Sequence, residues 1–438
     1  MLPVSDWLDM NCAVTACMFA LLVIAAQTVM RRSAEQIFCS AVKAVTGFLI
    51  FNFGVFVFLD EANRLRLLAT VAFGVAAPAN TNEFFRSNGI YYVPVMAFGF
   101  LLHLLIERKL VPDGRKIVYM GGCHVLLRLA LLTTGIAVTV YKETNWLYVV
   151  AFGTVITGIW YCIQPMYIDK QIQRVRGDGA AAYGHQTSIS IAITALAVKL
   201  MVRNRHDGDD TESIRLPKFA AILRDMGICM FLLQSAAVLA FCGACGAEAV
   251  GEICGTRLPV PVWAIAQGLQ FSAGYFILTS GLRMITGELM PALGAVSKKL
   301  VPDAKAAMDV PTLFPFGQNA VLFGAVSGSA VFFVLLLLFA KLGWGFIGGA
   351  TLYFYMAAGG AAVFGNKVGG KKGAVIGGVI TALLMAGGSL LIQYLGGAFY
   401  SAEYFCNVAS EPDDRLLLYP IVILLGRLLF GPREIPFG

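Results

Sequence analysis

GELMPALGAVSKKLVPDAKAAMDVPTLFPFGQNAVLFG, residues 287–324, is a polar, proline-containing stretch between two long apolar runs. Pro311 and Pro315 prevent a continuous helix from Ala304 into the next apolar run, and Asp309 lies at the break. If the flanking runs cross a membrane, irregular backbone at that depth is stable only where it is buried in protein or lines a wet cavity. The stretch therefore predicts either one wall of a site for a polar solute or a plain loop outside the membrane with a solvated Asp309.

The amino-acid composition indicates that the flanking apolar runs cross a membrane. The chain has 438 residues, of which 58% are hydrophobic and 13% charged, and its mean hydropathy is +0.75. Soluble domains carry about 25% charged residues. We therefore predict an all-α polytopic membrane protein with re-entrant hairpins, one of which would contain residues 187–201. About eleven spans are expected: Cys12–Met30, Ala41–Leu59, Tyr91–Ile106, Val118–Tyr141, Trp146–Ile163, Met226–Cys245, Val260–Thr286, Asn319–Leu342, Phe346–Phe364, Gly373–Leu395 and Leu416–Leu429.

The placement of Lys and Arg residues predicts the orientation. Basic residues gather in alternate loops, including residues 199–224, whereas residues 1–10 contain none and residues 246–257 are acidic and Arg-poor. The positive-inside rule then places the N-terminus outside. The net charge of +7 is spread over these loops, so it indicates topology and implies no nucleic-acid partner. The first apolar run is not followed by a signal-peptide cleavage site, so we expect it to be a retained helix.

An internal repeat is indicated by motifs that recur in the same order. GFLIFNFG (Gly47–Gly54) resembles GYFILTSG (Gly274–Gly281), and a Pro/Asn-rich break follows each of them. We expect a first half at residues 1–201, a cytoplasmic linker at 202–225 and a second half at 226–438. Such repeats, often inverted, are typical of secondary transporters. The first-half break contains Thr81 and Glu83, so the two breaks are expected to face one site.

Two of the four histidines lie in Gly-rich bends between apolar segments. His124 follows MGGC, and His185 is followed by Gln186 and Thr187. Imidazole in such a bend can donate and accept hydrogen bonds to a polyol or an enediol. The alternative is a capped hairpin turn, with Thr187 and Ser188 as helix N-caps, and both interpretations can hold for the same residues.

Other classes of site have little support in the sequence. No catalytic or metal-binding motif rises above background, and no cofactor is expected. FGNKVGGKKGAVIGG, residues 364–378, lacks the P-loop pattern, so we interpret it as a tight turn whose glycines permit close backbone approach. Most of the ten cysteines are interpreted as small core residues, and a disulfide among Cys242, Cys245 and Cys254 stays open.

Residues 283–324 carry a specific resemblance. They resemble the membrane component, enzyme IIC, of ascorbate-type sugar phosphotransferase systems (PTS), whose G-E-I-x-P-A-F block continues through A-L-D-x-P to P-N-A-V. TGFLI, TNE, VMAFGFLLHLL and GGCH agree in the same order, so the resemblance covers roughly residues 40–400. It implies a dimeric elevator-type permease of two inverted repeats in the bacterial inner (plasma) membrane.

The resemblance also implies a function. The family's L-ascorbate passes to a separate cytosolic IIB protein, which a IIA protein phosphorylates, so the chain itself is expected not to be an enzyme. Asp309 matches the acid of the A-L-D block and His124 the second histidine of G-H-H. The other substrate-binding residues that we expect are His185, Gln186, Thr187, Thr81, Glu83 and Thr351.

Departures from the family pattern leave the substrate open. G-H-H is GCH here, Ala306 replaces a proline and Y-A-P-N-A-V is FGQNAV. The substrate is thus L-ascorbate or a related small acidic sugar or polyol. The alternative function is an ion-coupled secondary transporter of the same fold, with coupling through Asp309 or Glu83 and no phosphorylation.

Overall fold

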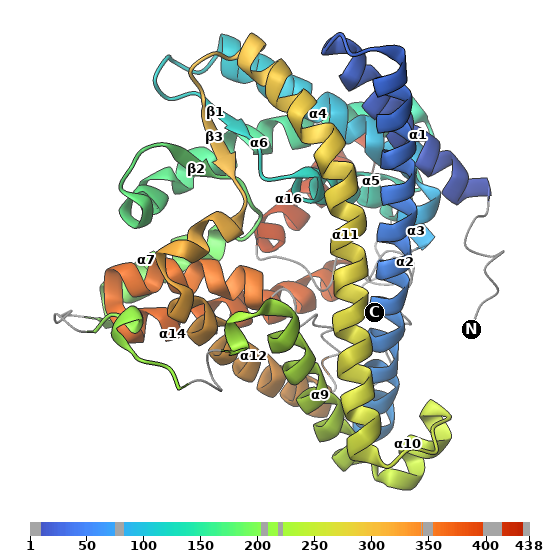
Figure 1. Ribbon diagram of the computed structural model, residues 1–438, viewed down its shortest axis with the longest axis vertical. Coiled ribbons are helices and arrows are strands. Elements are labelled where there is room, and N and C mark those ends of the chain that lie inside the picture. Colours follow the sequence, from blue (N-terminus) through green and yellow to red (C-terminus); the bar gives the residue numbers. More distant parts are fainter. Residues whose placement is uncertain are drawn as a thin grey trace.

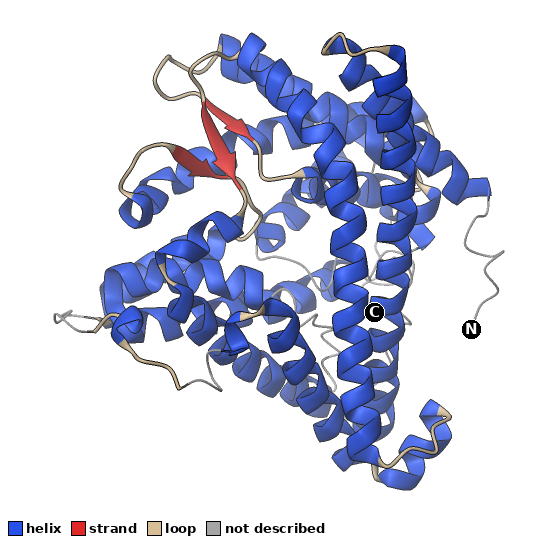
Figure 2. Ribbon diagram, in the orientation of Figure 1, coloured by secondary structure: helices blue, strands red, loops and turns tan. Residues whose placement is uncertain are grey.

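The computed structural model describes residues 10–74, 83–202, 209–217, 222–342, 344, 354–396 and 414–431 (Figure 1). Helices make up most of this part of the chain (Figure 2). The α-helices are α1 (Met10–Val29), α2 (Ala34–Phe73), α3 (Glu83–Ser87), α4 (Gly89–Lys109), α5 (Cys123–Gly135), α6 (Trp146–Arg176), α7 (Ser188–Met201), α9 (Met226–Cys245), α10 (Ala247–Cys254), α11 (Val260–Leu300), α12 (Gln318–Lys341), α14 (Gly359–Gly396) and α16 (Asp414–Phe430). Shorter 3-10 and π segments are η2 (Ile136–Val140), η3 (Thr211–Ser213), η4 (Ile222–Arg224), η5 (Val310–Phe316) and η6 (Phe354–Ala358).

The helices confirm a polytopic membrane protein. Within the described residues, eight helical segments are long and apolar enough to cross a bilayer, and residues 188–201 and 416–430 form shorter apolar helices. The expected span Val260–Thr286 lies inside α11, which is not among the eight because Gln267, Gln270 and several hydroxyl residues dilute its apolar character. The nine described cysteines are free thiols, including Cys242, Cys245 and Cys254.

The two longest helices, α2 and α11, run side by side through the molecule (Figure 1). Small residues let their backbones approach closely. A Cβ atom added to Gly54 would lie 2.3 Å from the backbone nitrogen of Leu278, and one added to Gly281 would lie 2.2 Å from that of Phe51. The two recurring glycine motifs of the sequence therefore pack directly against each other.

Helix α14 turns back on itself at Gly370, whose φ of 61° and ψ of −151° are not helical. A Cβ atom added to Gly365 would lie 2.1 Å from the carbonyl oxygen of Gly373. Two residues eight positions apart in a straight helix are separated by about 12 Å, so the segments before and after Gly370 form a hairpin. The prediction of a tight glycine turn at residues 364–378 is confirmed.

A small parallel sheet corrects the prediction of an all-α protein. Strands β1 (Ile117–Tyr119), β2 (Ala181–Tyr183) and β3 (Lys305–Met308) pair in the order β1-β3-β2 (Figure 2). Ile117 is paired with Lys305, and Ala181 with Ala306. The expected span Val118–Tyr141 therefore begins as a strand, and its helix starts only at Cys123. Strands of three or four residues carry too few side chains for a periodic pattern, which is why the sequence did not reveal them.

The sheet joins distant parts of the chain. β3 comes from the second half of the sequence and lies between β1 and β2 from the first half. Because all three strands are parallel, their carboxyl ends meet at one edge of the sheet. The residues that follow the three strands are thereby brought together.

Candidate functional site

Three polar side chains follow the three parallel strands. Asp309 comes directly after β3, His185 two residues after β2, and His124 five residues after β1, at the start of α5. His124 Nε2 lies 3.1 Å from Asp309 Oδ2, and His185 Nε2 lies 3.8 Å from Asp309 Oδ1. The structure therefore brings together one carboxylate and two imidazoles that lie more than 60 residues apart from one another in sequence.

Asp309 is held by the turn that it begins. Its Oδ1 accepts a hydrogen bond from the Val310 backbone N–H at 2.7 Å, and its carbonyl oxygen accepts one from Thr312 Oγ1 at 2.6 Å. The side chain is 23% exposed. Asp309 is therefore not a fully solvated acid, because its carboxylate lies next to His124 and His185.

The charges at the site follow from burial and proximity. Burial by itself raises the pKa of Asp309, but the adjacent His124 opposes it, and the pKa lies below its ordinary value. Burial lowers the pKa of His185 to about 3, although Asp309 acts in the opposite direction. The site at neutral pH thus holds an ionised Asp309 and a neutral His185, which can both donate and accept.

The tip between β2 and α7, residues 184–187, is fixed by hydrogen bonds of its side chains. His185 Nδ1 lies 3.0 Å from Thr187 Oγ1, and the Tyr183 hydroxyl also contacts Thr187 Oγ1. Gln186 Nε2 donates to the carbonyl oxygen of Val125 at 3.0 Å, which links the tip to α5. Thr187 is fully buried, so its contacts orient the His185 ring.

Helix α7 is capped by a residue that the sequence did not point to. Asp414 Oδ1 accepts hydrogen bonds from the backbone N–H groups of Ser188 and Ile189, each at 2.9 Å. Its Oδ2 accepts one from Ser188 Oγ at 2.7 Å, and its own N–H donates to the Gln186 carbonyl oxygen at 3.2 Å. Thr187 occupies the N-cap position without a capping hydrogen bond from its side chain. The expected cap at Thr187 and Ser188 is therefore supplied by Asp414, 226 residues after Ser188.

Arg128 is another residue that sequence reasoning missed. It lies four positions after His124 on α5, so the two share one helix face. Its positive charge acts on His185 and lowers the pKa of that imidazole. The i, i+4 spacing from His124 was the available signal.

The other predicted substrate-binding residues are not joined to this cluster by a described contact. Glu83, on α3, has 45% of its side chain exposed and contacts Ser87 and Arg86 on its own helix. Thr81 and Thr351 lie outside the described residues. These three assignments stay predictions.

Comparison with known proteins identifies the family of this chain. The chain matches the family described as the PTS system sugar-specific permease component (EIIC-GAT) over residues 12–407. It is 24% identical over 343 residues to a Mycoplasma pneumoniae protein named the ascorbate-specific PTS system EIIC component. The match covers 68% of this chain and 51% of that protein, so the chain spans about half the length of this curated relative. The predicted resemblance is thus confirmed at the level of the family. With most of its length matched and its helices long enough to cross a bilayer, the chain belongs to the EIIC-GAT family, described as the PTS system sugar-specific permease component.

Proposed function

We propose that this protein imports L-ascorbate, or a related small acidic sugar or polyol, and presents it to a separate phosphorylated IIB protein. The observation that carries the proposal is the Asp309–His124–His185 cluster where three parallel strands converge. A carboxylate accepts hydrogen bonds from sugar hydroxyls, and imidazole nitrogens can donate to or accept from ring oxygens. The name of the Mycoplasma pneumoniae relative supports ascorbate among such solutes.

The charge distribution indicates how an anionic sugar would lie in the site. Ascorbate is an anion at neutral pH, so its enediolate is repelled by an ionised Asp309. We place its hydroxyl tail at Asp309 and its ring oxygens toward His124 and His185. Arg128 is the cation of α5 whose charge acts on His185, and it offsets the negative charge of the substrate.

Vesicle transport distinguishes this function from ion-coupled transport. Protein reconstituted alone should bind or slowly equilibrate labelled ascorbate and form no phosphorylated product. With IIA, IIB and a phosphodonor enclosed in the vesicles, ascorbate added outside should accumulate inside as ascorbate phosphate. Product formed without a IIB protein would overturn the proposal. Uptake that needs no phosphodonor and collapses with an uncoupler would establish the alternative, in which Asp309 or Glu83 couples transport to an ion.

We also propose that the N-terminus lies outside and the linker at residues 202–225 inside the cell, as the basic loops indicate. Ser213 is exposed in the described part of this linker. Ser213→Cys, in a cysteine-free background, should resist a membrane-impermeant thiol reagent in intact cells and react after the cells are opened. Rapid labelling of intact cells would contradict this orientation.

The transport mechanism that we propose is an elevator within a homodimer of two inverted repeats. The close packing of Gly54 and Gly281 from the two recurring motifs supports a pseudosymmetric scaffold formed by α2 and α11. The site-bearing strands would belong to the moving part. Native mass spectrometry from membranes checks the dimer, and a monomer mass under all conditions would exclude it.

A further inference from the structure

The two outer strands of the small sheet have free edges that the protein must cover. β3 is central, so β1 and β2 each have one side without a strand partner in the described sheet. Backbone N–H and C=O groups on such edges need partners when they are buried. On β2, the edge is covered by Gln173 of α6: its Nε2 donates to the Ala181 carbonyl oxygen at 3.0 Å, and its Oε1 accepts from the Gly179 N–H at 3.1 Å.

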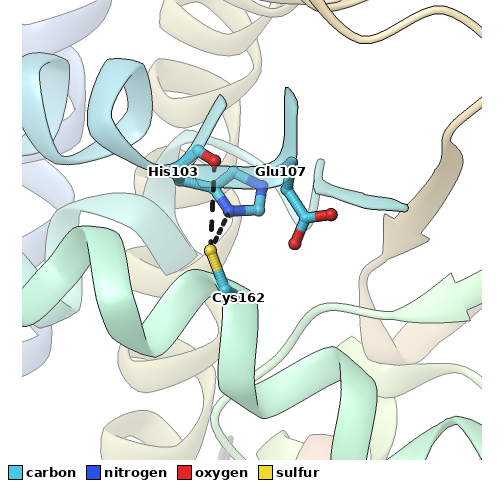
Figure 3. A group of neighbouring side chains, drawn as sticks. All are labelled: His103, Glu107 and Cys162. Carbon is cyan, nitrogen blue, oxygen red and sulfur yellow. Dashed lines mark hydrogen bonds between the residues drawn. The ribbon is translucent and has the colours of Figure 1, made fainter. Parts of the chain in front are cut away.

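The free edge of β1 is covered by two side chains of α4. His103 Nε2 accepts a hydrogen bond from the Tyr119 N–H at 3.0 Å, and Glu107 Oε2 accepts one from the Ile117 N–H at 3.0 Å. Figure 3 shows the two side chains side by side on α4. Both residues are fully buried. Residues four apart on a helix are separated by about 6 Å along its axis, and two residues of a strand advance by about 6.6 Å. The helix pair therefore matches the spacing of the two outward N–H groups.

We infer that His103 and Glu107 act together as a substitute strand for β1 and thereby position His124 at the substrate site. β1 ends at Tyr119, and only Met120 to Cys123 separate it from His124. Its inner edge is fixed to β3, which leads directly to Asp309. The pair on α4 fixes the outer edge, so both sides of the strand that leads to His124 are held. The hold on β1 does not depend on the proposed function, whereas the effect on sugar binding rests on it.

The same side chains could be taken for a metal site with Cys162, since their donor atoms all lie within 4.8 Å of one another. The hydrogen-bond pattern argues against this. Because Nε2 of His103 accepts from Tyr119, the proton of the neutral ring is on Nδ1, which lies 3.1 Å from Cys162 Sγ (Figure 3). A metal ion at Nδ1 would move that proton to Nε2, where it would face the Tyr119 N–H donor to donor.

Cys162 of α6 is the hydrogen-bond partner of the other nitrogen of the His103 ring. It accepts from His103 Nδ1, and its sulfur lies within 4.8 Å of a carboxylate oxygen of Glu107. The S–H group of Cys162 donates to the Gly158 carbonyl oxygen at 3.4 Å, one turn earlier on α6. Cys162 thus holds the proton of His103 on Nδ1, which leaves Nε2 to accept the Tyr119 N–H.

Substitutions that differ only in reach test the inference. His103→Gln and Glu107→Gln keep an acceptor at the required distance, whereas His103→Asn and Glu107→Asn are too short to contact β1. Hydrogen exchange at residues 117–119 and C2-hydrogen exchange at His124 need no ligand, and the dissociation constant of labelled ascorbate is measured beside them. The two Asn variants should show amide exchange about fivefold faster or more, an altered His124 exchange rate and about tenfold weaker ascorbate binding. The Gln variants should stay within about twofold of the parent.

Each outcome has a defined meaning. Unchanged exchange at residues 117–119 in the Asn variants would show that the pair does not hold β1. Faster amide exchange with an unchanged His124 rate would refute the positioning role. Gln variants as defective as the Asn variants, with stoichiometric zinc in the parent alone, would establish a metal site instead. If the exchange results are as expected but the parent does not bind ascorbate, the positioning role stands and the ascorbate proposal fails.

Discussion

Asp309→Asn is expected to weaken ascorbate binding by about ten- to a hundredfold while the fold is retained. The substitution removes the negative charge but nearly keeps the shape, and one amide oxygen can still accept the Val310 N–H. Hydrogen bonds to charged groups contribute about 1.5–3 kcal/mol, which corresponds to this range of affinity. Equilibrium binding of labelled ascorbate to purified protein measures the effect, and the melting temperature in detergent checks the fold.

Asp303→Asn is the matched control for Asp309→Asn. Asp303 lies six residues earlier in an exposed turn with φ of 62°, a conformation that Asn tolerates well. We therefore expect its affinity to stay within about twofold of the parent. If Asp309→Asn binds ascorbate as tightly as Asp303→Asn and the parent, Asp309 does not contact the substrate.

Asp414→Ala is expected to destabilise the protein more than any of the preceding substitutions. It would leave the backbone N–H groups of Ser188 and Ile189 without their acceptor. Asp414 and Ser188 are both fully buried, so water cannot readily replace the carboxylate. Each unsatisfied buried group costs about 1–3 kcal/mol, so a total loss of about 3 kcal/mol or more is expected. Thermal unfolding in detergent measures it, and ascorbate affinity should fall as well because the tip that carries His185 loses its anchor.

Asp414→Asn separates the anchoring contacts from the charge. Its amide oxygen can accept the two backbone N–H groups, and its amide nitrogen can donate to the Ser188 hydroxyl. We expect less than half of the destabilisation of Asp414→Ala. An Asp414→Ala variant that unfolds at the same temperature as the parent would show that Asp414 is not needed to hold α7.

The membrane helices were accessible to sequence reasoning because their signal is long and redundant. In α12, for example, a run of apolar residues follows Asn319 with no charge until Lys341, so no single residue decides the prediction. The strands were not accessible. Lys305 to Met308 contain one charge and two alanines, and only the pairing of three distant segments makes them a sheet.

The candidate site was partly predictable for a related reason. His124, His185 and Asp309 each stand at a local break in an apolar pattern, and the family resemblance pointed to the same residues. Asp414 carries no such mark, because it acts through backbone groups of a helix that lies 226 residues away. His103 carries none either, because its sequence surroundings are those of any buried histidine in a helix. Their roles depend on tertiary contacts that have no local pattern in the sequence.

The most direct test of the central claim is an electron cryomicroscopy structure of the protein with L-ascorbate. We predict density for one ascorbate at the carboxyl ends of β1, β2 and β3, with a tail hydroxyl within hydrogen-bond distance of the Asp309 carboxylate and ring oxygens facing His124 and His185. Ascorbate bound elsewhere in the protein, with the Asp309 carboxylate still contacting only histidine and the Val310 N–H, would contradict the account.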